Sequence, residues 1–235
     1  MGHIWSVLSP CMMLGLYLFV FGLIFGGRFG ILKDENIFDF ALALFLGLSL
    51  FNAVAETISS SPTIILAQPN LVKKVVFPLE IIPLSKVIAS LYNSLLSIFI
   101  CILLIPLSHA GFNIQIILLP ILLFPLAMIC LGLSWGLSAI GVFYRDINNL
   151  TAFASTALMY ASAIVYSPSR IPTKLSFIFK FNPILNIIDQ SRRITLWHQS
   201  ISLSTILIVY LTSTLILLLG YYLFVSLKPF FAEVL

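Results

Sequence analysis

The strongest constraint in this sequence is a series of long apolar segments that carry almost no charge. Glycine, proline and charged residues gather in the short stretches between them. An α-helix needs about 20 mainly apolar residues to cross the hydrocarbon core of a bilayer. The sequence therefore predicts an all-α membrane protein with about six transmembrane helices. The predicted spans are Ile4–Phe25, Phe38–Ile58, Leu84–Leu107, Ile114–Phe143, Ile147–Tyr166 and Ile201–Leu227.

Composition leads to the same class. Only 9% of the 235 residues are charged and 60% are hydrophobic, whereas soluble domains carry about 25% charged residues. Six spans would use about half of the chain or more. Residues 1–235 are therefore predicted to form a single membrane domain, with no room for a catalytic head.

The basic residues and cysteines indicate neither nucleic-acid binding nor a metal site. The net charge is +4, but its basic residues are scattered through loops, where they suit interface anchors for anionic lipids. Cys11, Cys101 and Cys130 lie inside apolar runs with no metal-ligand spacing. Residues 1–10 lack the basic region of a signal peptide, so the first apolar segment is predicted to be a retained span.

Recognisable catalytic motifs are absent from the sequence. There is no P-loop, H-E-x-x-H or G-x-S-x-G pattern, and the three histidines lie far apart at segment ends. We predict no catalytic residue, no metal and no bound cofactor in this chain. The spans are nearly uncharged, with Glu56 as the exception near a predicted helix end, which disfavours an ion-coupled pump. A membrane glycosyl or acyl transferase and an ion-coupled carrier remain as alternatives.

Two loop regions are predicted to form short helices outside the spans. Apolar residues of the segment Asn70–Glu80 recur at helical spacing, with Lys73, Lys74 and Glu80 elsewhere around the helix, which predicts an amphipathic helix. Ser59–Pro62 is expected to end the second span before it. In the long polar stretch Ser167–Ser200, Asn182-Pro183 separates two predicted helices by offering a cap and a first turn. These helices cover Pro172–Phe181 and Pro183–Trp197.

Small and aromatic residues within the spans suggest helix packing and a substrate path. Gly22/Gly26 and Gly132/Gly136 have the G-x-x-x-G spacing that allows close helix approach. Aromatic rings stack on the C–H faces of sugars, although lipid-facing aromatics would give the same pattern. The candidates for a glycan path are Tyr17, Phe21, Tyr92, Trp135 and Tyr160.

The run Asn70–Leu84, NLVKKVVFPLEIIPL, closely resembles the cytoplasmic segment of polysaccharide-export ABC permeases of the type-2 class, which export O-antigen, capsule or teichoic acid. Weaker resemblances follow in the same order along nearly the whole chain. They are Ile4–Pro10 at the first span, Ala55–Ile58 on the second, Phe143–Ile147 after the fourth, and Asn182-Pro183 with Asp189 and Arg192 in the external helical hairpin.

The resemblance implies a transmembrane permease subunit that pairs with a second copy of itself and exports a lipid-linked polysaccharide. ATP and Mg²⁺ would be bound by two separate P-loop ATPase subunits. The resemblance assigns ATPase coupling to Asn70, Leu71, Lys73, Lys74, Phe77, Pro78, Glu80, Arg145 and Asp146. It assigns an external gate to Pro172, Asn182, Pro183, Asp189 and Arg192.

The resemblance also places the protein in the cell inner membrane with both termini cytoplasmic. Counting Lys and Arg in the loops gives five inside against seven outside for this orientation, which opposes the positive-inside rule. Five of those seven lie in the loop expected to fold back as gate helices. Members of the family usually begin with an amphipathic surface helix that borders the lipid-side entrance, whereas this sequence starts almost at its first span. Either that helix is missing or the start is misplaced, and the step that this departure concerns is substrate loading.

Overall fold

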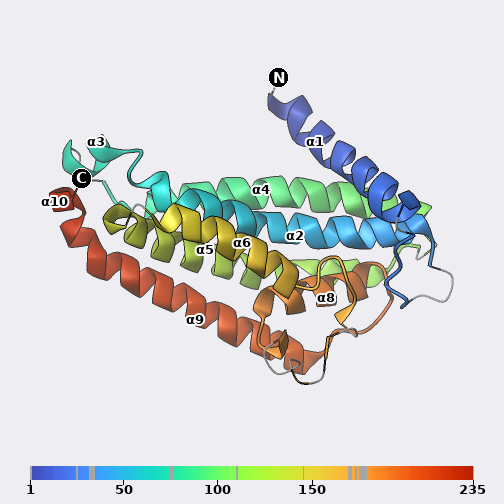
Figure 1. Ribbon diagram of the computed structural model, residues 1–235. Coiled ribbons are helices and arrows are strands. Elements are labelled where there is room, and N and C mark those ends of the chain that lie inside the picture. The colour runs from blue at the N-terminus through green and yellow to red at the C-terminus, as the bar shows by residue number, and fades with distance from the viewer. Residues whose placement is uncertain are drawn as a thin grey trace.

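The computed structural model describes residues 2–24, 26–31, 35–74, 77–109, 111–144, 146–168, 171–172, 174 and 179–234, without the side chains of residues 2–7 and 74. Every element in these ranges is a helix (Figure 1). In chain order they are α1 (Gly2–Tyr17), η1 (Leu18–Ile24), α2 (Ile37–Ile64), α3 (Pro69–Lys74), α4 (Ile81–Leu104), η2 (Ile105–Leu107), η3 (Ile114–Leu118), α5 (Leu119–Phe143), α6 (Ile147–Ala161), α8 (Pro183–Thr195), α9 (Leu203–Leu227), η5 (Lys228–Phe230) and α10 (Phe231–Val234).

Four helical stretches in the described residues are long and apolar enough to cross a membrane. They are Ile37–Ile64, Ile81–Leu107, Ile114–Phe143 and Leu203–Val234, and a shorter apolar helix covers Leu8–Ile24. The predicted second, third, fourth and sixth spans correspond to the four long stretches. The predicted fifth span corresponds to α6, which has 15 residues and is thus about 22 Å long.

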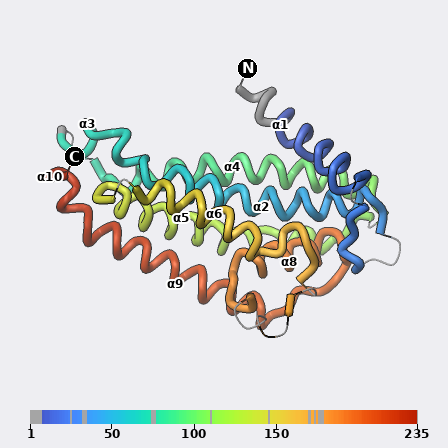
Figure 2. The backbone as a smooth tube through the Cα atoms, in the orientation of Figure 1, coloured from blue at the N-terminus to red at the C-terminus, as the bar shows by residue number. Residues whose placement is uncertain are grey.

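The long helices pack around α2. Its apolar window is 78% buried, against 17% for that of α9, so α2 forms the centre of the bundle and α9 lies at its edge. α2 contacts α4, α5 and α6, and α9 packs on α5. α3 and α10 lie at one end of the bundle and α8 at the other, whereas α1 leans away from the other helices (Figure 2).

Small polar residues join α2 to α4 along an antiparallel seam. The hydroxyls of Ser90 and Ser94 donate to the carbonyls of Ala53 and Ser49 at 3.0 and 2.6 Å. The Cys101 thiol approaches the Leu42 carbonyl at 3.8 Å. Each step along α4 is matched by an equal step backwards along α2. The side chains are short, so the two backbones come close and the hydroxyls are satisfied inside an apolar bundle.

Glycines bring α5 and α9 into close contact, which confirms the packing interface predicted at Gly132/Gly136. A Cβ added to Gly132 would overlap the Ile216 carbonyl, and one added to Gly220 would overlap the Gly132 carbonyl. The other predicted pair does not form a helical face, because η1 ends at Ile24 and Gly26 has a positive φ of 56°. Such a φ is open to glycine at little steric cost.

The prediction that Ser59–Pro62 ends the second span is wrong, because α2 continues to Ile64 with Pro62 inside it. The hydroxyls of Ser60 and Ser61 donate to the carbonyls of Glu56 and Thr57, one turn earlier, at 2.7 and 2.6 Å. Serine bonded in this way is compatible with a helix interior. The extension places Glu56 two turns inside the candidate span rather than near its end.

Candidate functional site

A hollow of about 780 Å³ lies between α1, α2, α4 and α6. It exists where α1 diverges from the bundle and where the facing helices carry short side chains (Figure 1). Most of its polar lining consists of hydroxyl and amide groups, which are neutral and both donate and accept hydrogen bonds. These residues are Ser9, Ser49, Asn52, Ser59, Ser90, Asn93, Ser94, Ser97 and Ser155. We call this feature the polar hollow.

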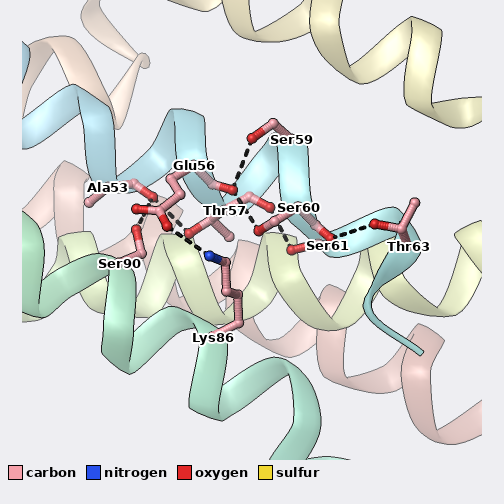
Figure 3. Close-up of polar contacts among 9 residues, drawn as sticks. All are labelled: Ala53, Glu56, Thr57, Ser59, Ser60, Ser61, Thr63, Lys86 and Ser90. Carbon is pink, nitrogen blue, oxygen red and sulfur yellow. Dashed lines mark hydrogen bonds and ion pairs between the residues drawn. The ribbon is translucent and has the colours of Figure 1, made fainter. Parts of the chain in front are cut away.

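One ion pair adjoins the polar hollow. Glu56, which lines it from α2, meets Lys86 of α4 with 2.8 Å between Oε1 and Nζ (Figure 3). Their side chains are 35% and 33% exposed. A lone charge in the middle of a span costs about 2.5–3.5 kcal/mol by insertion scales, so each residue makes the other more tolerable there. The charges of Glu56 and Lys86 cancel, so the pair adds polar groups beside the hollow but no net charge.

The structure does not bring the five aromatic candidates together. Tyr17 lines the polar hollow and its ring lies 6.4 Å from that of Phe21. Tyr92 lies on a separate apolar groove between α4 and the start of α5. The Trp135 indole donates to the Glu80 carbonyl at 3.2 Å, and Tyr160 is exposed on α6.

Sequence reasoning missed the small polar residues that line the hollow, although their spacing was visible. On α4, Asn93 and Ser94 lie three and four residues after Ser90, and Ser97 lies four and three residues after them. Residues so spaced share one face of a helix. Among the described residues, no group of His, Cys, Asp and Glu side chains is close enough to hold a metal ion.

The amphipathic helix expected over Asn70–Glu80 is shorter in the structure. α3 covers Pro69–Lys74, and Phe77 and Pro78 are not helical, because a residue before proline is disfavoured in the helical region. Asn70 and Lys73 are exposed, whereas Leu71 and Val72 face the bundle and are partly buried. The two-sided character that the sequence predicted is therefore present in α3.

α3 rests on an apolar cluster at its end of the bundle, which we call the end cluster. Leu71, Val72 and Phe77 pack against its buried members, Ile65, Leu79, Ile82, Ala139, Val142, Phe224 and Phe231. Asp146 is exposed and directly precedes α6, which follows α5 at the end of that helix where Val142 joins the cluster. Arg145 and the side chain of Lys74 lie outside the described residues.

Glu80 forms an ion pair with Lys228, with 2.7 Å between Oε1 and Nζ. Partial burial alone would raise the pKa of Glu80. The hydrogen bond from Lys228, a backbone hydrogen bond and the charge of Lys228 outweigh that effect, so the pKa lies below its ordinary value. Within this chain, Glu80 holds the start of α4 to the end of α9, and its expected contact with an ATPase stays a prediction.

At the opposite end, Asn182 and Pro183 begin α8 as the sequence predicted. The Asn182 side chain accepts hydrogen bonds from the Ile184 and Leu185 amides at 3.0 and 3.3 Å, and Pro183 occupies the first turn. The Asn182 amide also donates to the Ala161 carbonyl at the end of α6. The predicted helix Pro172–Phe181 falls mostly outside the described residues, where Pro172 itself is exposed.

Arg192 is buried within the fold, with 1% of its surface exposed. Its guanidinium donates to the carbonyls of Ala43, Ala163 and Ile164 at 2.8, 3.1 and 2.6 Å, and lies 4.5 Å from the centre of the Phe29 ring. Burial lowers the pKa of Arg192 to about 9, against an opposing effect of Asp189, so the group stays charged at neutral pH. Asp189 pairs with Arg193 rather than Arg192, at 2.8 Å.

Residues 1–196 match the model of the ABC-2 type transporter family. The chain belongs to this family, and it is a membrane permease subunit without a catalytic domain. In such transporters the ATPase is a separate subunit.

Curated relatives match the chain along its whole length. Two proteins of Klebsiella pneumoniae, both named O-antigen export system permease protein RfbA, are 26% and 25% identical to it. They cover 100% of this chain and 87% and 88% of their own length. The protein of the same name in Myxococcus xanthus is 23% identical and covers 99% of this chain and 87% of its own.

Proposed function

We propose that this chain forms half of the membrane channel through which a lipid-linked polysaccharide of the O-antigen type is exported. A second copy of the chain would supply the other half, and two copies of a P-loop ATPase would supply the energy. The full-length similarity to three O-antigen export permeases supports the cargo class.

The observation that carries the proposal is the polar hollow. It places hydroxyl and amide groups from two candidate transmembrane stretches, α2 and α4, and from α1 and α6 around a space of about 780 Å³ in an otherwise apolar bundle. Neutral groups of this kind exchange hydrogen bonds with sugar hydroxyls as the sugars lose water. A chain of sugars can thus slide along such a surface, since no single strong contact holds it in place.

The proposed topology has six spans. The α1–η1 stretch and α6 would complete the four long ones, with the short α6 reaching across with help from the residues that follow it. An even number of spans puts both termini on one side of the membrane. We place them in the cytoplasm together with α3 and α10, and we place α8 on the outer side, despite the opposing count of basic loop residues.

The ATPase would dock on the exposed side of α3. Asn70 and Lys73 are available for contact there, while Leu71 and Val72 tie the helix to the end cluster. Asp146 directly precedes α6 and is exposed, and it would form part of the same surface. Movement of α3 would then reach α2 and α4, which flank it in the chain and line the polar hollow.

The proposed external gate is anchored rather than free. Arg192 fixes α8 to α2 and to the segment after α6 through three carbonyls. A gate built on α8 would therefore open through movement of α2 or α6, with α8 following them. Asp189 and Arg193, paired on the less buried side of α8, are better placed to meet the emerging glycan.

Deleting the gene in its host and measuring surface polysaccharide tests the proposal. Surface glycan should disappear while the lipid-linked precursor accumulates inside the cell, and a plasmid copy should reverse both effects. Normal export after deletion would overturn the proposal. Transport that persists when ATP hydrolysis is blocked would favour an ion-coupled carrier, and failure to assemble the precursor would favour a membrane transferase.

A further inference from the structure

The segment between α3 and α4 is attached to α9 and α10 as well as to its neighbours in sequence. Lys228, directly after α9, pairs with Glu80 at 2.7 Å, and Glu80 directly precedes α4. The Trp135 indole of α5 donates to the Glu80 carbonyl at 3.2 Å. The start of α4 is thus connected to both α5 and α9, which do not line the polar hollow.

Phe231 provides a second attachment at the same end. Its side chain is fully buried, and its ring centre lies 5.6 Å from that of Phe224 and 6.1 Å from that of Phe143. It belongs to the end cluster on which Leu71 and Phe77 pack. Phe231 therefore fills the space between α9, α5 and the segment that carries α3.

The bend after α9 makes this arrangement possible. Pro229 lies in η5, between the end of α9 and the start of α10. Proline lacks an amide hydrogen and disfavours continuation of a straight helix. α10 turns toward α3 and contacts both α3 and α5 (Figure 1). Lys228 and Phe231 lie on either side of the bend, and together we call them the α9 clasp.

We propose that Lys228 and Phe231 are positioning residues for energy coupling, because they join the α3–α4 segment to α9. A displacement of α3 would then move α9 together with α4, rather than tilting α3 alone. This inference rests on the proposed ATPase contact of α3. Without the clasp, the ATPase would still bind and hydrolyse ATP, but less of its movement would reach the spans.

A matched pair of phenylalanine substitutions tests the inference. Phe230 is the neighbour of Phe231 and is 51% exposed, so Phe230→Ala controls for the loss of an aromatic ring. Each variant is expressed in cells that lack the native gene, and surface polysaccharide is measured on these cells. ATP hydrolysis is measured in membranes prepared from the same cells, with the ATPase subunit bound. Phe231→Ala should lower the polysaccharide exported relative to ATP hydrolysed several-fold, Phe231→Leu should restore most of it, and Phe230→Ala should leave it unchanged.

A charge exchange tests the other half of the clasp. Lys228→Glu and Glu80→Lys should each lower the same ratio, and the double variant should recover it. The inference would be overturned if Phe231→Ala left the ratio of exported polysaccharide to hydrolysed ATP unchanged. It would also be overturned if protein level, ATP hydrolysis and export all fell together, with no recovery in Phe231→Leu or in the double exchange. Retention of the ATPase subunit by Lys73→Glu would instead overturn the docking role proposed for α3, whatever the clasp variants show.

Discussion

Gly47 of α2 lies directly against the guanidinium of Arg192 of α8, so that a Cβ at residue 47 would overlap Arg192 Nη2. The missing side chain at this position is what allows a fully buried cation to reach the Ala43 carbonyl one turn earlier on α2. The two residues together join α8 to α2, the central helix of the bundle.

We expect Gly47→Ala to destabilise the protein by displacing Arg192 from its carbonyl partners. A buried polar group left without partners costs about 1–3 kcal/mol, and more when it is charged. Gly15→Ala is the matched control, because a Cβ there meets nothing within 4 Å. Thermal unfolding of the purified protein in detergent should show a clear loss for Gly47→Ala alone. Equal behaviour of the two variants would contradict the role assigned to Gly47.

The interface between α5 and α9 should distinguish two glycines one turn apart. A Cβ at Gly132 would overlap the Ile216 carbonyl, whereas a Cβ at Gly136 would lie 3.6 Å from the Gly220 Cα, an ordinary contact. Overpacking of this kind costs about 1–3 kcal/mol. Gly132→Ala should therefore lower the unfolding temperature, and Gly136→Ala should be tolerated. The reverse order would show that the two helices pack in a different register.

Making the polar hollow apolar should impair export without unfolding the protein. Asn52 and Asn93 line it with exposed side chains, and leucine is close to asparagine in shape. Each lost hydrogen bond to a sugar is worth about 0.5–1.5 kcal/mol. Asn52→Leu and Asn93→Leu should each slow polysaccharide export about two- to tenfold.

Thr214→Val on α9 is a control of similar chemistry outside the hollow. Surface polysaccharide and protein level should both be measured for all three variants. If export were undiminished in the two asparagine variants, the glycan would not pass through the polar hollow.

Reversing the charge of Lys73 should weaken ATPase binding, because this side chain is exposed on α3. Lys180→Glu is the control, since Lys180 is also exposed but precedes α8 at the other end of the bundle. Co-purification of the ATPase subunit should fall for Lys73→Glu and stay unchanged for Lys180→Glu. If both variants retain the ATPase, the contact lies elsewhere.

Features with local physical causes were predictable from the sequence. The cap at Asn182, the proline in the first turn of α8 and the two-sided character of α3 depend on neighbouring residues, and the structure has all three. The packing of Gly132/Gly136 was predictable because membrane helices approach closely where small residues share a face.

Features that depend on distant partners were not predictable. The carbonyl acceptors of Arg192 lie 28 to 149 residues away from it in the sequence, and no local pattern identifies them. The continuation of α2 past Ser59 was missed because serine and proline usually mark a helix end. Here the hydroxyls of Ser60 and Ser61 bond within the helix, and the surrounding bundle stabilises the extra turn.

The seam between α2 and α4 allows the sequence of α2 to change without loss of the hydrogen bonds between the two helices. Ser90, Ser94 and Cys101 donate from α4, and their three acceptors on α2 are main-chain carbonyls, which any residue provides. Small substitutions at Ser49 or Ala53, which also face the hollow, would leave these bonds in place. The α2 side of the polar hollow can therefore change in sequence while these three bonds between α2 and α4 are kept.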